Sequence, residues 1–103
     1  MTMHIDGQVA TPEASRWLQR LCHHFSRKIE VRYDAHQGHA AFPWGTCEMH
    51  ADGDGALLRF ACSAAGSEEL ARVQYAIDEH VKLFSRKNPL TVQWGAPSGA
   101  PQA

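Results

Sequence analysis

The stretch FPWGTC, residues 42–47, interrupts a regular strand pattern in the middle of the chain. Large apolar residues before its glycine have even numbers, Phe42 and Trp44, whereas those that follow have odd numbers, beginning with Cys47. Because side chains alternate between the two faces of a strand, one strand cannot keep both sets on one face without an extra residue. We therefore predict one strand over about 40–51, with a bulge in this stretch that keeps both aromatic residues near the core.

The same stretch also has a functional interpretation, because bulges often re-aim side chains at binding sites. Trp44 or Cys47 would then line a pocket. All three cysteines, Cys22, Cys47 and Cys62, lie at positions expected to face inward, where a free cysteine usually acts as a small apolar residue. A cysteine nucleophile needs exposure and a neighbouring base or cation, so we assign no catalytic residue.

Strands are predicted on both sides of this stretch, at residues 4–11, 29–35, 57–63 and 90–94. HQGH, residues 36–39, is predicted as a turn, and DGDG, residues 52–55, as a hairpin. The outward positions are polar with mixed charge: Glu30, Arg32, Thr46, Glu48, His50, Arg59, Thr91 and Gln93.

Two amphipathic helices are predicted between these strands. The first begins at Thr11–Pro12–Glu13, with Thr11 as its cap, and runs to about Lys28. Its apolar stripe consists of Ala14, Trp17, Leu18, Leu21, Cys22 and Phe25. The second opens at Ser67 and stops at Asn88–Pro89. Its stripe consists of Leu70, Val73, Ile77, Val81 and Phe84.

The order of elements is β-α-β-β-β-α-β, which predicts an α+β fold. We expect an antiparallel sheet of about four to five strands, with both helices packed on one face and water on the other. The tetrapeptide FSRK closes both helices, at residues 25–28 and 84–87. It indicates either a duplicated unit or, as we prefer, two independent helix ends that share basic residues and an anchoring phenylalanine.

Length and charge limit the class of protein. The chain has 103 residues and a formal net charge of -1, which indicates one domain over residues 1–94 with a disordered tail at 95–103. The small net charge argues against attraction to nucleic acid or to a membrane. No apolar run spans a bilayer, the N-terminus has no secretory pattern, and an odd number of cysteines forms no disulfide framework. We therefore expect a cytoplasmic protein.

Two histidines mark a candidate pocket. At about 100° per residue, His24 and His80 lie at matching edges of the two apolar stripes. If these edges face each other, the imidazoles come close, with Trp17 and Phe84 beneath them, and the histidine pKa values fall. The pocket between the helices and the bulged strand is expected to be lined by Trp17, His24, Phe42, Trp44 and His80. No spacing among the seven histidines is typical of a metal site, so we expect no metal.

Three arginines, Arg16, Arg20 and Arg27, share the solvent side of the first helix. They form either an ordinary solvated face or a docking surface for an acidic protein partner. No aromatic platform is expected among these charges, which argues against single-stranded nucleic acid as a ligand.

Four stretches, ASRWLQRLCHHFSRK, FPWGTC, IDEHVKLFSRK and LTVQW, together resemble the domain of unknown function 2218 family, over about residues 9–94. Its members are small bacterial proteins, and similar domains occur joined to siderophore-interacting, flavin-dependent ferric reductases. The resemblance implies an accessory role in iron or redox metabolism, and it supplies no catalytic residue or cofactor.

The leading hypothesis is a non-catalytic binding or accessory module of the bacterial cytoplasm that serves a redox or iron-handling enzyme and has no cofactor of its own. One alternative is a small ligand-binding protein or enzyme that uses the predicted pocket. Another is a metal or haem binder through His24 and His80. The sequence leaves the oligomeric state open.

Overall fold

The computed structural model describes residues 2–52, 56–87 and 89–95, and these form two helices and six strands. The α+β class is confirmed. The elements in chain order are β1 (Met3–Ala10), α1 (Ala14–Phe25), β2 (Glu30–Tyr33), β3 (Gln37–Phe42), β4 (Gly45–Asp52), β5 (Leu57–Ala64), α2 (Ser67–Phe84) and β6 (Gln93–Trp94).

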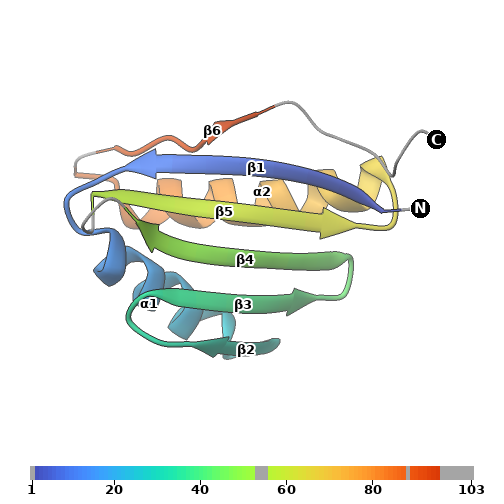
Figure 1. Ribbon diagram of the computed structural model, residues 1–103, viewed down its shortest axis with the longest axis horizontal. Coiled ribbons are helices and arrows are strands. Elements are labelled where there is room, and N and C mark those ends of the chain that lie inside the picture. Colours follow the sequence, from blue (N-terminus) through green and yellow to red (C-terminus); the bar gives the residue numbers. More distant parts are fainter. Residues whose placement is uncertain (1, 53–55, 88, 96–103) are drawn as a thin grey trace.

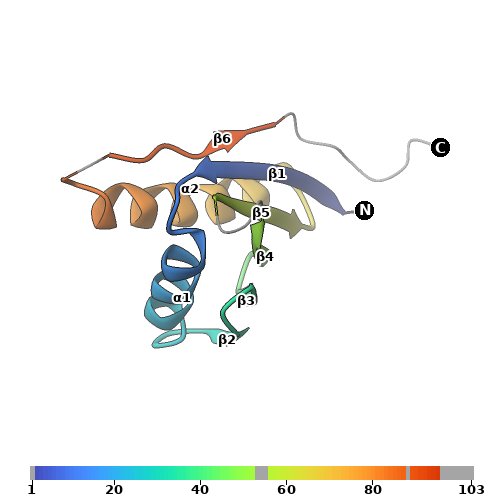
Figure 2. The same cartoon turned by 60° about the vertical axis from the view of Figure 1, so that its left-hand side comes forward.

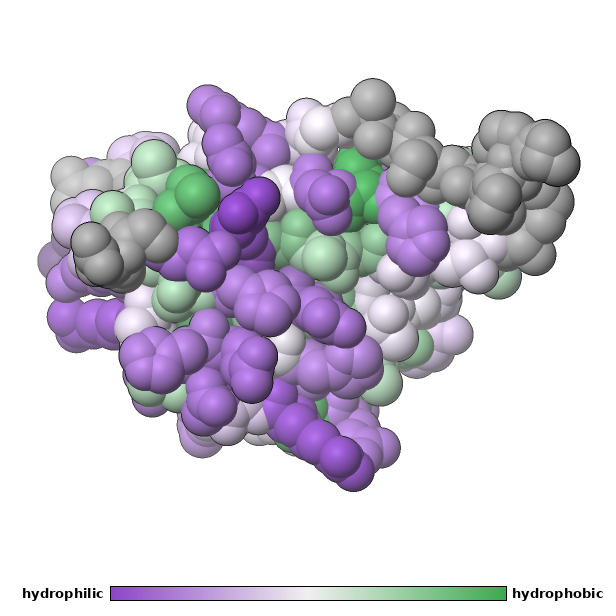
Figure 3. Space-filling model, in the orientation of Figure 1, coloured by the Kyte–Doolittle hydropathy of each residue, from purple (hydrophilic) through white to green (hydrophobic). Residues whose placement is uncertain are grey.

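All six strands belong to one antiparallel sheet with the order β2-β3-β4-β5-β1-β6. Both helices lie behind this sheet in Figure 1, α1 across β2 to β5 and α2 against β5, β4 and β1. Figure 2 shows that the two helices run in different directions. The opposite face is uncovered and largely hydrophilic (Figure 3), so the predicted arrangement of one packed face and one wet face is confirmed.

The stretch FPWGTC is a hairpin turn, and the prediction of one bulged strand over 40–51 is wrong. Pro43 and Trp44 form the turn, and Phe42 pairs with Gly45 across it. Residues directly opposite each other on two strands point to the same face of the sheet. Across a two-residue turn each such pair has one even and one odd number, so the inward residues change from even to odd, as they would after a bulge. The sheet gains a strand for the same reason.

The turn predicted at HQGH also lies elsewhere. Gln37, Gly38 and His39 belong to β3, and Asp34 makes the turn by accepting the backbone N–H groups of His36 at 2.8 Å and Gln37 at 2.9 Å. Gly38 is buried beneath α1, where an added Cβ would lie 2.6 Å from the sulfur of Cys22. This glycine therefore allows the helix to approach the sheet closely.

Both helices end at the phenylalanine of their FSRK copy, Phe25 in α1 and Phe84 in α2. α1 is shorter than predicted because Thr11 does not cap it; the Thr11 hydroxyl accepts the Glu13 N–H at 3.2 Å in a turn before the helix. α2 begins at Ser67 as predicted.

Parts of three other predictions, the hairpin at 53–55, the helix stop at residue 88 and the tail at 96–103, lie outside the described residues. Gly95, the first residue of the predicted tail, still donates to the Asp6 carbonyl at 2.8 Å.

The core lies between the helices and the sheet. Its largest fully buried side chains come from both layers and include Phe60, Leu18, Leu21 and Met49. Each such side chain contributes about 1.5–3 kcal/mol by leaving water. Trp94 ties β6 to α2, since its indole N–H reaches both carboxylate oxygens of Asp78 at 3.0 and 3.1 Å. No helix among the described residues has the length and apolarity needed to cross a membrane.

Replacement of Gly45 by alanine tests how closely β4 must approach β5 beside the β3–β4 turn. A Cβ at Gly45 would collide with the Ser63 carbonyl oxygen and lie 2.9 Å from the Ala64 Cβ. We expect Gly45→Ala to lower the free energy of unfolding by about 1–3 kcal/mol, measured by urea denaturation. Gly95→Ala is the matched control, because its nearest heavy atom would lie 3.6 Å away. A Gly45→Ala chain as stable as the control would show that β4 and β5 do not need this close approach.

Candidate functional site

A hollow of about 340 Å³ opens where the two helices meet the β3–β4 turn. It brings together four of the five residues predicted to line a pocket, and the fifth, Trp17, lies in a separate groove beside Arg20. The lining residues are His24, Phe25, Lys28, Ile29, Phe42, Pro43, Trp44, Ala76 and His80.

The β3–β4 turn supplies the aromatic wall of this hollow. Phe42 and Trp44 flank the turn proline, and their rings stack with centroids 5.9 Å apart and planes inclined by 13°. The edge of Phe42 also meets Phe25 of α1, with centroids 5.2 Å apart. Aromatic packing of this kind holds the turn against the end of the helix.

His24 and His80 lie close together, which is the outcome expected if the edges of the two helices face each other. Their ring centroids lie 4.5 Å apart, and both rings pack on the phenylalanines that end the helices. Phe84 lies 5.3 Å from His24, as predicted, but Phe25 takes the place predicted for Trp17 and lies 4.9 Å from His80.

Hydrogen bonding and charge give the two histidines different environments. The His80 Nδ1 atom lies 2.7 Å from the Ala76 carbonyl oxygen, which can only accept, so Nδ1 carries a proton. Partial burial lowers the pKa of His24, and His80, Arg27, Lys28 and His23 lower it further through their charge. When both imidazoles are neutral, the hollow therefore offers their ring nitrogens beside the charged ammonium group of Lys28.

Sequence reasoning missed Lys28, because the helix was expected to continue to that residue. α1 instead ends at Phe25, and the following turn carries Lys28 to the rim of the hollow. Helical spacing could not have placed it there. Pro43 and Ala76 were also missed, since neither residue type carries a functional signal.

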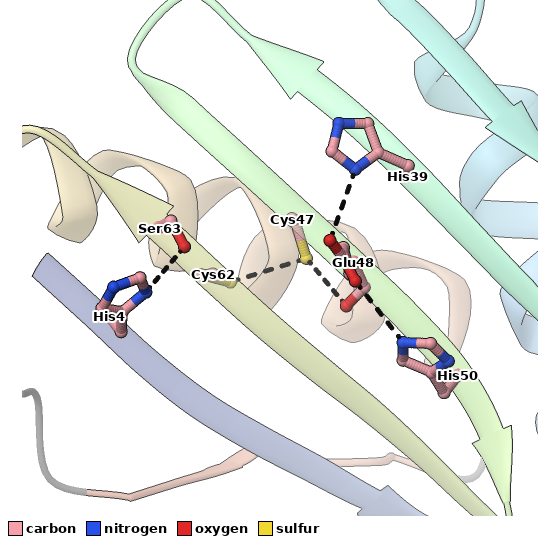
Figure 4. A network of polar contacts seen from close by, with 7 residues as sticks. All are labelled: His4, His39, Cys47, Glu48, His50, Cys62 and Ser63. Atoms are coloured by element: carbon pink, nitrogen blue, oxygen red, sulfur yellow. Dashed lines mark hydrogen bonds and ion pairs between the residues drawn. The ribbon is translucent and has the colours of Figure 1, made fainter. Parts of the chain in front are cut away.

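The cysteines take no part in this hollow. Cys22, Cys47 and Cys62 are fully buried, as predicted, and the sulfur atoms of Cys47 and Cys62 lie 3.5 Å apart on β4 and β5 (Figure 4). Burial raises the pKa of Cys22 to about 11. The hydrogen bond with Cys62, followed by burial, raises the pKa of Cys47 well above its ordinary value. Cys22 and Cys47 therefore remain thiols at neutral pH and are poor nucleophiles.

Metal-ligating side chains do not converge in the part of the chain that the structure describes, where no group of three or more His, Cys, Asp or Glu could hold an ion. On the open sheet face, Glu48 lies between His39 at 3.9 Å and His50 at 3.7 Å (Figure 4). His24 and His80 likewise gain no third ligand of this kind among the described residues.

Of the three arginines predicted to share the solvent side of the first helix, Arg16 and Arg20 line a small common pocket with Glu13 and Trp17, whereas Arg27 lies beyond the end of α1 at Phe25. Arg16 pairs with Glu13 at 3.4 Å, and Arg27 lines neither the hollow nor the groove. Arg20 lies over two aromatic rings, 4.4 Å from the centroid of Phe84 and 5.8 Å from that of Trp17. The expectation that no aromatic residue accompanies these charges is therefore wrong for Arg20.

Acidification should destabilise the fold through His24. The pKa of His24 is lower in the folded chain than its ordinary value of about 6.5, so the unfolded chain binds more protons. Stability is fully present above about pH 6.5 and is lost as the pH falls through the folded pKa. Urea denaturation at several pH values between about 7 and 5, where histidine changes its charge, should show this loss. His24→Gln should reduce it.

A partial effect is expected from His80→Gln, which removes the neighbouring imidazole but leaves the burial of His24. His36→Gln, a change in an exposed turn, is the control and should follow the wild type. A His24→Gln chain that loses as much stability as the wild type would assign the pH dependence to other groups.

The comparisons with known proteins agree with this fold. No curated protein matches the chain. The NMR structure of PA4090 from Pseudomonas aeruginosa is similar with a TM-score of 0.74 and 24% sequence identity, over 90% of this chain and 95% of that one. At this identity the likeness shows the fold alone. The family described as "Uncharacterized protein conserved in bacteria (DUF2218)" matches residues 6–95, and the chain belongs to this family.

Proposed function

We propose that this protein is a binding module whose hollow accepts a small, flat aromatic ligand with an anionic group. The hollow between the helices and the β3–β4 turn carries this proposal. The stacked pair of Phe42 and Trp44 forms one wall, and aromatic side chains are well suited to contact a flat ring. Lys28 at the rim supplies a positive charge for the anionic group.

The volume and polar groups of the hollow narrow the ligand further. Pockets for small molecules have volumes of about 300–1,000 Å³. The hollow, at about 340 Å³, therefore suits a compound of one or two rings better than a nucleotide or haem. The imidazoles of His24 and His80 add hydrogen-bonding groups beside an otherwise apolar surface. A few placed polar groups in an apolar pocket are typical of sites that orient a ligand.

A 2-naphthoate titration tests this proposal. We expect saturable binding, followed by titration calorimetry, and at least tenfold weaker binding by Trp44→Ala, since loss of one aromatic contact removes on the order of 1.4 kcal/mol. Lys28→Gln should weaken 2-naphthoate but not its uncharged methyl ester. Trp17→Phe, outside the hollow, is the control and should bind as the wild type does. Unchanged binding by Trp44→Ala would contradict this use of the hollow.

The role of such a module is accessory rather than catalytic in this proposal. The residues that line the hollow include no carboxylate and no cysteine, so they offer neither an acid–base carboxylate pair nor a thiol nucleophile. Three free, buried thiols suit a reducing compartment, which supports the bacterial cytoplasm. The family resemblance supports service to a redox or iron-handling enzyme.

Addition of the purified chain to a flavin-dependent ferric reductase from the same bacterium tests the accessory role. We expect a higher rate of iron reduction when the iron is supplied as its salicylate complex, because the chain would present this aromatic, anionic iron ligand to the enzyme, and no reduction by the chain alone. Trp44→Ala should lose the effect, while Tyr75→Phe, a change at an exposed position of α2 outside the hollow and the groove beside Arg20, should keep it. A rate that does not change on addition of the wild-type chain would contradict the accessory role. It would not contradict ligand binding, which the 2-naphthoate titration tests separately.

A further inference from the structure

A second hollow, of about 640 Å³, lies beside the first along the seam between the helices. Phe84 links the two hollows, because its ring lines the second hollow, lies 4.4 Å from the guanidinium of Arg20 and packs on His24 of the first hollow. We name this second hollow the Arg20 groove. It is formed mainly by Trp17, Arg20, Leu83, Arg86, Lys87 and Leu90.

The contacts of Arg20 leave it ready to bind an anion. Its guanidinium lies over the rings of Phe84 and Trp17, at 4.4 and 5.8 Å from their centroids. None of the ion pairs among the described residues includes Arg20. Stacking uses the flat faces of a guanidinium and leaves the N–H donors at its edge, which match a carboxylate.

The charge around Arg20 has one sign. Arg86 and Lys87, both exposed, follow the end of α2 and line the same groove. The only carboxylate among the lining residues belongs to Glu13, which is paired with Arg16 at 3.4 Å. The lining thus carries three positive charges and one negative charge, although the whole chain has a formal net charge of -1. A local concentration of positive charge attracts an acidic partner.

The groove also offers apolar surface. Leu83 is 49% exposed, one of three large apolar residues that are exposed in the described chain. Trp17 and Leu90 are partly buried beside it, so a ligand that covers them would remove apolar area from water. Tryptophan and arginine together are also the residue types that dominate binding energy at protein interfaces.

We propose that the Arg20 groove binds an acidic peptide segment of a partner protein. Carboxylates of the segment bind Arg20, Arg86 and Lys87, and an apolar side chain between them covers Leu83 and Trp17. A peptide fits better than a small anion, because a volume of about 640 Å³ is much larger than one carboxylate or phosphate and its walls are part apolar. This surface is distinct from the ligand hollow and does not depend on the function proposed for that hollow.

Fluorescence anisotropy with a labelled octapeptide tests the proposal. The probe is Glu-Glu-Leu-Glu-Glu-Leu-Glu-Glu, and its analogue has glutamine at every acidic position. We expect the acidic probe to bind, the analogue not to bind, and Arg20→Gln to weaken binding about tenfold, since a hydrogen bond to a charged group is worth roughly that factor. The double change Arg86→Gln with Lys87→Gln should weaken binding at least as much, and salt should weaken all complexes.

Two arginines outside the groove provide matched controls. Arg27→Gln changes the same helix region, and Arg72→Gln changes an exposed position of α2, so both should bind the probe as the wild type does. The thermal unfolding of the two controls and of the Arg86→Gln, Lys87→Gln double variant should match that of the wild type, because exposed charges contribute little to stability. Arg20→Gln also loses contacts with Phe84 and Trp17, so its binding is measured well below its own unfolding midpoint.

Three outcomes would overturn the proposal. The first is no binding of the acidic probe by the wild type. The second is equal loss in Arg20→Gln and the two controls, which would mean that only the overall charge matters. The third is binding of inorganic phosphate alone with the same dependence on Arg20, and displacement of the probe by it, which would make the groove a small-anion site.

Discussion

The contact that joins the two helices at Phe84 determines where both candidate sites lie. The Phe84 ring is 5.3 Å from His24 and 4.4 Å from the guanidinium of Arg20, so α1 meets the end of α2 at this side chain, next to the contacts that His80 makes with His24 and Phe25. Because both helices bury their stripes on the same face of the sheet, the seam between them must open to either side of that contact. The ligand hollow and the Arg20 groove both lie near this contact, because Phe84 lines the groove and packs on His24, which lines the hollow.

The chain reversal at Pro43 and Trp44 supplies the aromatic wall of the ligand hollow. In a single bulged strand these aromatic residues would lie within the sheet, whereas the hairpin carries them to its end, beside Phe25. The parity of the apolar residues could not separate a bulge from a hairpin, since both exchange even for odd positions. What distinguishes them is the pairing of β3 with β4, in which Phe42 lies opposite Gly45, a contact between strands that has no local signal in the sequence.

The helical spacing of apolar residues predicted those site residues whose position depends only on the geometry of their own helix. His24 and His80 were found from helical spacing alone, because the edge of an apolar stripe is fixed by about 3.6 residues per turn wherever the helix packs. Lys28 and Trp17 were misplaced because their positions depend on where α1 ends and how it crosses the sheet. Arg20 was placed in solvent by the same spacing, yet its long side chain reaches back over Phe84 and covers apolar surface.

Arg20, on the helical side, differs from two arginines of the open sheet face in how its charge is satisfied. On the open sheet face, Arg59 pairs with Asp52 at 3.6 Å and Arg32 with Glu30 at 3.8 Å, so an incoming anion would have to displace a carboxylate that is already present. On the helical side, Arg20 is held by aromatic rings, and no ion pair among the described residues includes it. An aromatic contact fixes the position of a cation without neutralising its charge. Arg20 can therefore still attract an anionic ligand or segment at the seam, whereas Arg32 and Arg59 on the sheet face are already paired with carboxylates.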